Sequence, residues 1–338
     1  MRPFVFQTTL AAACCLITGT VALAPLASAA AGENLPVGRE LTITNRYALP
    51  ILELSGLATA RTAPTKSGAT GKRDISLYAV GDKTYDVVTF YIAGSSGGIA
   101  ISAKDASPAL GKRASTESQW EAVAIDDVDI ICMLSETRSE MPCFDRSLEE
   151  SRGIIKLDTS PLKHLDRLWG NRPNSRGEGM LLMKKGHMLV LKEKNPSLLV
   201  EFGPRGDAPM GYGPETFLQP GEAFTLPGPD QQDLALAALK TWEFSDRLRE
   251  LATDASEITI GPDGHVYLLS QQSLVLVRLE KVLEPDEDKV NVDNDAWWTL
   301  PKGIGKAEGL VIDGESRPWI GIDIKQKGKP NLFRLSPL

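Results

Sequence analysis

The sequence predicts an all-β protein, a β-propeller of about five blades, with six blades as the alternative count. Three observations predict this fold. A short opening motif recurs five times, each copy is followed by two further strand-like runs, and the last copy lacks a strand that the start of the chain supplies. Successive openings are roughly 50 to 80 residues apart, and such sheets bury both faces only by packing around a common axis.

The start of the chain has the features of a signal peptide rather than of a folded segment. Arg2 is the only charged residue before Glu33, an apolar run follows it, and Ala27-Ser28-Ala29 matches an A-x-A cleavage signal. We therefore expect residues 1–31 to be removed and residues 32–338 to form a single propeller domain, secreted to the exterior or to the cell envelope. No later run is long and apolar enough to suggest a transmembrane segment.

Composition limits the choice of partners. The 338 residues carry a formal net charge of −7 and are 42% hydrophobic. That length is sufficient for a large buried core. The acidic balance argues against a nucleic-acid partner, because neutralising phosphates requires an excess of Lys and Arg. We expect a monomer whose partner is a small molecule or a cell-surface ligand.

Two cysteines follow the signal peptide, Cys132 and Cys143. In an exported protein, two cysteines on either side of a polar segment suggest one disulfide across a hairpin. Two free thiols and a metal-binding pair are the alternatives, although no histidine lies near either cysteine in the sequence to favour zinc.

The opening motif places a carboxylate or a hydroxyl at the start of the first strand of each unit. Its polar residues are Ser55, Glu121, Glu178, Ser256 and Glu308. Second strands are expected at residues 77–80, 130–134, 188–191, 266–269 and 318–322. Third strands are expected at residues 87–90, 153–157, 198–202, 274–279 and 331–335. Apolar runs broken by Gly, Pro and Asn are typical of such β-meanders.

The two ends of the chain predict how the ring closes. The fifth unit ends after its third strand, whereas residues 39–45 alternate apolar and polar side chains and have no assigned partner. Pairing them as the outer strand of the fifth unit joins the ends and covers an edge. Other segments fit the repeat poorly: residues 203–229 are expected to form a long excursion, 231–240 a short helix or a buried strand, and 284–295 a charged loop.

Several motifs resemble those of a known family. They are the Ser-Gly-Leu opening at residues 55–57, the Glu-Gly openings at 178 and 308, and residues 191–196 (LKEKNP), 254–258 (DASEI) and 331–334 (NLFR). From about residue 50 to 336 the chain is similar to the SdiA-regulated, esterase-like and phytase-like group of secreted bacterial β-propellers. The resemblance implies a propeller, an association with calcium, and esterase-like or phytase-like activity. The sequence departs from the group at Ala122 and Glu257, which replace a glycine.

If the openings start the innermost strands, their polar residues surround the central channel at one height. Three carboxylates held together there repel one another, so without a cation at least one keeps its proton well above the reference pKa of about 4.3. Calcium is the cation we expect, because it takes oxygen ligands. The alternative is that these side chains only bond to backbone groups of neighbouring blades. The candidate ligands are Glu121, Glu178, Glu308, Ser55 and Ser256.

A phosphate or carboxylate ligand requires basic groups near the openings. The candidates are Arg176, Lys192, Lys194 and Lys306, with solvated loop side chains as the alternative reading. Residues 94–98 (GSSGG) match G-x-S-x-G in letters, but no strand-to-helix context surrounds them and they are interpreted as a flexible turn. No H-E-x-x-H or P-loop is present, so no catalytic residue is assigned. The first hypothesis is a calcium-associated propeller that binds a ligand at the channel mouth without chemistry. The alternative is a calcium-dependent hydrolase of phosphate or carboxylic esters, with the metal as Lewis acid and water activator.

Overall fold

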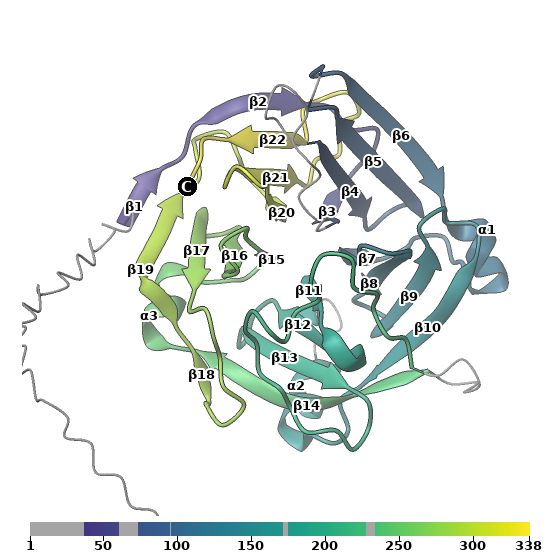
Figure 1. Cartoon of the computed structure of the whole chain (residues 1–338), viewed down its shortest axis with the longest axis vertical. Helices are drawn as coiled ribbons and strands as arrows, with labels where there is room; N and C mark the ends of the chain where they lie inside the picture. Colours follow the sequence, from purple (N-terminus) through teal and green to yellow (C-terminus); the bar gives the residue numbers. More distant parts are fainter. Residues whose placement is uncertain (1–36, 61–73, 95, 172–174, 228–233) are drawn as a thin grey trace, which may run out of the picture. The chain divides into compact units, whose positions relative to one another are not determined.

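Five blades, each built from four antiparallel strands, surround a common centre in the computed structural model (Figure 1). The structure describes residues 37–60, 74–94, 96–171, 175–227 and 234–338, and the expected signal peptide lies outside these ranges. The innermost strands of the five sheets contact one another in cyclic order, so the ring is closed. The prediction of a five-bladed β-propeller is confirmed.

Each blade consists of four strands that run outward from the centre in chain order, except that the last blade borrows its outer strand from the start of the chain. Blade 1 contains β3 (Leu54–Thr59), β4 (Ile75–Gly81), β5 (Asp86–Ile92) and β6 (Ile99–Asp105). Blade 2 contains β7 (Trp120–Ile125), β8 (Ile130–Ser135), β9 (Glu140–Asp145) and β10 (Ser151–Asp158). Blade 3 contains β11 (Gly179–Leu182), β12 (Met188–Lys192), β13 (Leu198–Gly203) and β14 (Ala235–Phe244). Blade 4 contains β15 (Glu257–Ile260), β16 (Val266–Ser270), β17 (Val275–Leu279) and β19 (Val292–Thr299). Blade 5 contains β20 (Ala307–Ile312), β21 (Pro318–Ile322), β22 (Leu332–Leu335) and β2 (Ile43–Tyr47).

The start of the chain closes the ring in two places rather than one. As predicted, β2 pairs antiparallel with β22 as the outer strand of blade 5. The prediction of one continuous strand over residues 39–45 is wrong, however. Residues Val37–Glu40 form a separate strand, β1, which pairs in parallel with β19 of blade 4. Leu41 lies between the two strands, and its side chain is completely buried in the apolar cluster shared by blades 4 and 5.

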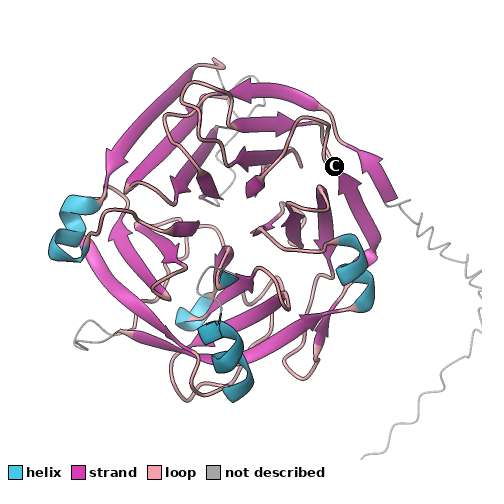
Figure 2. Ribbon diagram, turned by 180° about the vertical axis from the view of Figure 1, so that it is seen from behind, coloured by secondary structure: helices cyan, strands magenta, loops and turns pink. Residues whose placement is uncertain are grey.

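Short helices occupy connections between strands (Figure 2). The Ser245 side chain caps one of them, α3, by accepting a hydrogen bond from the amide of Leu248 at 3.3 Å. None of the helices in the described part of the chain is long and apolar enough to cross a membrane. The helical segments are α1 (Ser107–Leu110), η1 (Gly111–Arg113), α2 (Lys163–Asn171), η3 (Lys184–Gly186) and α3 (Asp246–Leu251).

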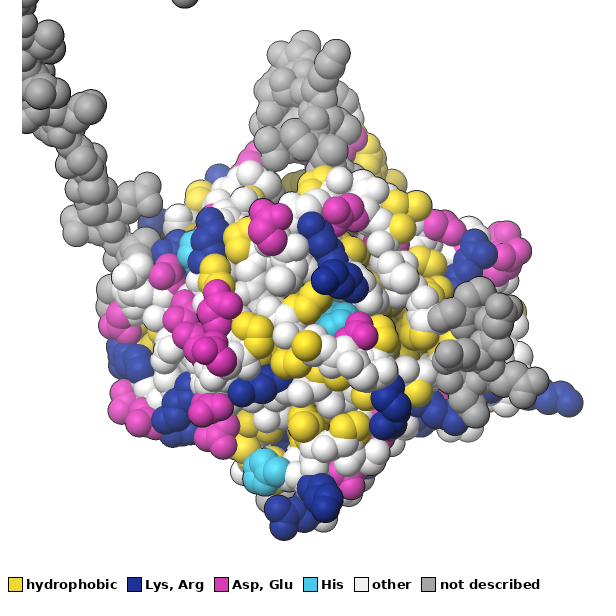
Figure 3. Space-filling model, turned by 60° about the horizontal axis from the view of Figure 1, so that its bottom comes forward, with side chains coloured by type: hydrophobic (Ala, Val, Ile, Leu, Met, Phe, Trp, Pro, Cys, Tyr) yellow, Lys and Arg dark blue, Asp and Glu magenta, His cyan; other side chains and the backbone are white. Residues whose placement is uncertain are grey.

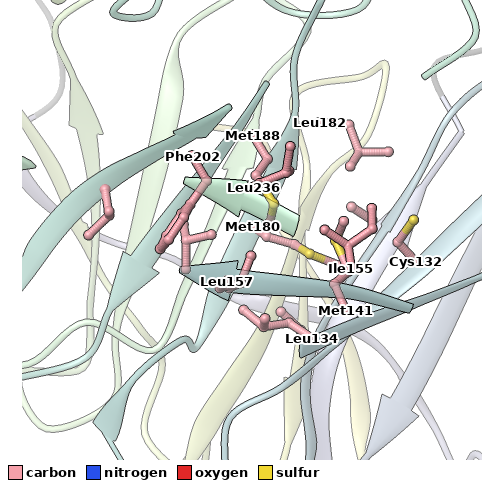
Figure 4. Close-up of a cluster of buried hydrophobic side chains, with 14 of the residues drawn as sticks. Cys132, Leu134, Met141, Ile155, Leu157, Met180, Leu182, Met188, Phe202 and Leu236 are labelled. Atoms are coloured by element: carbon pink, nitrogen blue, oxygen red, sulfur yellow. The ribbon is translucent and has the colours of Figure 1, made fainter. Parts of the chain in front are cut away.

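The apolar core lies between the blades, as expected for sheets that are buried on both faces. The cluster shown in Figure 4 fills the space between blades 2 and 3 with residues such as Leu134 and Phe202. Cys132 and Cys143 lie in this cluster and form the predicted disulfide between β8 and β9. The expected hairpin-spanning bridge is therefore confirmed.

Three other expectations change at the outer edges of the blades. The third strand of blade 2 is β9, so the run expected at residues 153–157 belongs to the fourth strand, β10. The described part of the ambiguous segment at 231–240 contributes to β14 from Ala235 onward. The strands β10 and β14 pair in parallel, which joins blades 2 and 3 into one sheet. The expected charged loop at 284–295 contains the short β18 (Lys289–Val290) and the start of β19.

Candidate functional site at the channel mouth

The five polar residues of the opening motif occupy equivalent positions at the start of the innermost strands. In blades 1, 2 and 5 the pairing with the second strand shifts at this residue, which marks a β-bulge. In blades 3 and 4 the residue precedes the strand, and its amide donates to the second strand at 2.9 Å. We call these residues the bulge tier: Ser55, Glu121, Glu178, Ser256 and Glu308.

The two serines of the bulge tier connect neighbouring blades. Ser55 Oγ donates to the backbone oxygen of Trp120 at 2.6 Å, and Ser256 Oγ donates to that of Ala307 at 2.8 Å. Each acceptor belongs to the next blade and immediately precedes its bulge glutamate. For the serines, the geometry corresponds to the structural alternative that the sequence left open, since both hydroxyl protons are used between blades.

A second set of polar residues joins the bulge tier, and sequence reasoning missed it. In every blade the residue directly after the second strand extends over the same end of the channel. We call these residues the loop tier: Asp82, Glu136, Glu193, Gln271 and Asp323. Three of them interact with the bulge glutamate of the following blade: Asp82 with Glu121, Glu136 with Glu178, and Gln271 with Glu308. The two tiers together form the channel mouth.

Crowding of carboxyl groups in the channel mouth raises several pKa values. Burial, followed by repulsion from Glu136 and Asp82, holds the pKa of Glu121 well above its usual range. Burial also raises the pKa of Glu308 to about 8, with Asp323 as the strongest repelling charge and Lys306 opposing the shift. At neutral pH the channel mouth therefore retains protons, as the sequence led us to expect for crowded glutamates without a cation.

Glu136 and Glu178 form a hydrogen-bonded carboxyl pair. Burial raises the pKa of Glu136 to about 7, while hydrogen bonds from the Arg176 amide and from Glu178 oppose the shift. The pKa of Glu178 lies well above its usual range, because of burial and of repulsion from Glu121 and Glu136. The pair therefore shares a proton that is held mainly by Glu178, although Glu178 still has part of its surface exposed to the channel.

The channel is closed just below the bulge tier. The next position along each inner strand is Gly56, Ala122, Gly179, Glu257 or Gly309, depending on the blade. Small residues are needed here because the inner strands are in close contact: a Cβ atom on Gly179 would lie 2.5 Å from Glu257 Oε1.

Glu257 is the exception among these small residues, and it closes the channel. Its Oε1 accepts from the amide of Ile258 at 2.9 Å, and the amide of Leu57 also lies close to the carboxyl group. Leu57 belongs to blade 1 and Gly179 to blade 3, so a carboxyl group beside both stands across the axis of the ring. Only 2% of Glu257 is exposed, and its Oε2 has no hydrogen-bond partner of normal geometry among the described residues. Burial raises the pKa of the Glu257 carboxyl group well above its usual range.

The four basic residues expected to bind phosphate have other partners. The Arg176 guanidinium donates to the backbone of Trp169 and Thr137, both at 2.8 Å, and to Ser139. Lys192 is completely buried and donates to the backbone oxygens of Lys194 and Pro196. The remaining two lysines belong to the channel mouth, where Lys194 pairs with Glu193 and Lys306 with Asp323.

The residues of the channel mouth offer oxygen donors of the kind that calcium prefers, but their arrangement does not match a calcium site. Across the residues that the structure describes, no group of three or more His, Cys, Asp or Glu side chains is placed to hold a metal ion. The five candidate ligands surround the channel instead of meeting at one point, and both serine hydroxyls donate to backbone oxygens. We therefore derive no chemical step through calcium.

His187 lies in the β11–β12 turn, at the opposite end of blade 3 from the channel mouth. Its Nδ1 is 2.6 Å from Glu201 Oε1 and its Nε2 is 3.2 Å from Asp207 Oδ2. Burial lowers the pKa of His187, but its two carboxylate partners outweigh burial and the net shift is upward. Because Glu201 also accepts from the amides of Met210 and Gly211, the cluster attaches the long excursion to the blade.

Comparisons with known proteins add little about chemistry. No family model matches the chain, and no curated protein matches it. Among solved structures, glutaminyl cyclase from Myxococcus xanthus is 14% identical, with 89% of this chain and 97% of that chain covered and a TM-score of 0.45. An aldose sugar dehydrogenase from Streptomyces coelicolor, in its PQQ-bound form, is 11% identical, with coverages of 89% and 99% and a TM-score of 0.42. A streptogramin B lyase is 9% identical, with coverages of 88% and 72% and a TM-score of 0.39. At these levels of similarity, no substrate or activity can be transferred to this chain.

Proposed function

We propose that this β-propeller is an exported binding protein that takes a positively charged ligand at the channel mouth. The observation that carries the proposal is the placement of Glu121, Glu136, Glu178 and Glu308 around one channel mouth, with no Lys or Arg side chain within ion-pair distance of them among the described residues. The nearby lysines pair with loop-tier residues instead, as Lys306 does with Asp323. A cation placed among the four glutamates would relieve their repulsion, and this relief would contribute to affinity.

One face of the protein supports a local site rather than a general attraction for cations. On the face shown in Figure 3, acidic and basic side chains are interspersed with apolar ones. Interspersed charges of opposite sign largely cancel at long range, and salt screens charges beyond about 8 Å at physiological ionic strength. Binding should therefore depend on the channel mouth itself.

A thermal-shift series tests this proposal. The purified mature domain is melted at pH 7.5 and 0.15 M salt with calcium, magnesium or putrescine as the added cation. We expect at least one of the three to raise the melting temperature in a saturable manner, because binding to the folded state stabilises it. The effect should disappear in Glu178→Gln and persist in Glu215→Gln, a matched change at an exposed position away from the mouth. No shift with any of the three cations would refute the proposal.

The same samples test the hydrolase alternative. Turnover of p-nitrophenyl phosphate or p-nitrophenyl acetate in the presence of calcium is expected to be absent. Turnover that is lost on adding chelator and in Glu178→Gln would replace the binding hypothesis with the hydrolase.

A further inference from the structure

We propose that the ligand of the channel mouth is an organic amine, bound through the N–H groups of a primary ammonium. This inference rests on the proposed function and specifies its ligand class. It depends on three observations. The glutamates of the channel wall form no ion pair among the described residues, they are spread over three blades, and the carboxyl group of Glu257 is buried at the channel floor.

The four glutamates of the channel wall, Glu121, Glu136, Glu178 and Glu308, form no ion pair among the described residues. Lys83 pairs with Asp82 at 3.0 Å, and the other lysines of the mouth, Lys194 and Lys306, also pair with loop-tier acids. The wall does accept hydrogen bonds from neutral groups, the side-chain amide of Gln271 on Glu308 and the backbone amide of Arg176 on Glu136. The wall therefore presents carboxyl groups without cationic partners, and the lysines at the rim are neutralised by other acids.

The placement of the wall glutamates suits an ammonium group better than a metal ion. Calcium requires six to eight oxygen atoms at about 2.3–2.6 Å from a single point. The glutamates come from blades 2, 3 and 5, and no three acidic or histidine side chains among the described residues are grouped closely enough to hold a metal. An ammonium group has three N–H donors that point in different directions and reach acceptors at about 2.7–2.9 Å, so it tolerates acceptors on separate blades.

The floor of the channel supplies a second, independent sign of a ligand. Glu257 is 98% buried between the inner strands, and its Oε2 has no hydrogen-bond partner of normal geometry among the described residues, with the amide of Leu57 as the nearby donor. A buried polar atom without a partner costs about 1–3 kcal/mol, so such atoms normally meet water or a ligand. Gly179, which touches this carboxyl, directly follows Glu178, so the floor lies one residue below the wall.

The side chains beside the floor are apolar. Leu54 and Leu57 pack against the inner glycine of blade 5, Gly309, and are buried. They belong to the core between blades 1 and 5, so packed apolar side chains bound the floor on this side.

Binding of an ammonium to this wall should release protons. The free wall keeps protons near neutral pH, whereas an ammonium favours the ionised carboxylates, so binding weakens as the pH falls from 8 to 6. The expected loss of affinity is about tenfold per pH unit for each proton displaced.

Isothermal titration of the mature domain with putrescine tests the proposal. The titrations are run at pH 7.5 and 0.15 M salt in phosphate and in Tris, because the difference in heat between the buffers counts the protons released. We expect saturable binding with proton release, at least tenfold weaker binding in Glu178→Gln and Glu308→Gln, and unchanged binding in Glu215→Gln. Tetramethylammonium, which has the same type of charge but no N–H donors, should bind at least tenfold more weakly than methylammonium.

The outcomes separate the inference from the proposed function. Calcium binding that depends on Glu178, without putrescine binding, would overturn the amine and leave a cation-binding protein. Equal binding of tetramethylammonium and methylammonium would also overturn the amine. Putrescine binding that Glu178→Gln and Glu308→Gln both retain would place the amine elsewhere on the surface. Binding of none of calcium, magnesium and putrescine would overturn the proposed function as well.

Discussion

Replacing Glu136 by glutamine should make the protein more stable at high pH. The pKa of Glu136 is about 7 in the folded state, against 4.5 for an unperturbed glutamate. The folded state therefore binds more protons than the unfolded state between these values, and its stability falls as the pH rises from about 4.5 to 7. At about 1.4 kcal/mol per pKa unit, Glu136 alone accounts for up to about 3 kcal/mol of this loss.

A glutamine at this position is neutral at every pH and avoids the loss. It also keeps a carbonyl oxygen that can accept from the amide of Arg176, which now donates to Glu136 at 3.2 Å. Glu136→Gln should thus match the wild type within about 1 kcal/mol at pH 5 and exceed it by about 2–3 kcal/mol at pH 8.

Urea denaturation at pH 5, 6, 7 and 8 in buffer free of divalent cations and amines measures this difference. All other titrating groups are common to both proteins, so the difference in unfolding free energy isolates the channel mouth. Glu215→Gln serves as the control and should follow the wild type at every pH. A constant difference between Glu136→Gln and the wild type from pH 5 to pH 8 would refute the reasoning.

Five other variants test the fold around the channel. Ser55→Ala and Ser256→Ala should each lower the unfolding free energy by about 1 kcal/mol, because each removes one hydrogen bond between blades, and unchanged denaturation midpoints would show that these bonds contribute nothing. Deleting residues 39–45 removes parts of β1 and β2 with the buried Leu41, so the melting temperature of the whole domain should fall; an unchanged transition would contradict the closure of the ring. Replacing both Cys132 and Cys143 by alanine should cost about 3 kcal/mol in urea denaturation, and a loss below 1 kcal/mol would mean that the cross-link hardly restricts the unfolded chain. Gly179→Ala should destabilise the domain by more than about 1 kcal/mol, because the added Cβ atom would overlap Glu257 Oε1 and the amide of Ile258. An unchanged unfolding free energy in urea denaturation would show that the residues of the channel floor move apart at little cost.

The bulge tier could be predicted from the sequence because its residues interrupt apolar runs. Glu121, Glu178 and Glu308 each stand directly before small and apolar residues at the start of a unit, and a polar residue in that setting is conspicuous. Their equivalence then follows from the repeat itself, since each unit pairs its first and second strands in the same register.

The loop tier could not be recognised in the same way. Asp82, Glu136 and Asp323 follow apolar strands at points where turns normally carry acidic residues, so nothing in their local sequence distinguishes them. Only their common position, directly after the second strand of each unit, identifies them, and this becomes visible once the five units are aligned on that strand.

Strand assignments failed where local preference opposed the tertiary structure. The strand β9 contains Pro142, which normally argues against a strand with partners on both sides. The strand β14 begins with an Ala- and Leu-rich run that an isolated helix would accept equally well, and its pairing with β13 and β10 decides the outcome. In both cases neighbouring strands supply the stabilisation that the residue preference does not.

Titration of individual carboxyl groups by carbon-detected NMR tests the central claim, the crowding of carboxyl groups in the channel mouth, most directly. With the glutamate side chains assigned, the account predicts that Glu136 titrates near pH 7 and Glu308 near pH 8, and that Glu136→Gln lowers the pKa of Glu121 by removing a repelling charge. If every glutamate of the channel mouth titrates below about pH 5, as an unperturbed glutamate does, the carboxyl groups are not crowded and the proposed cation site has no basis.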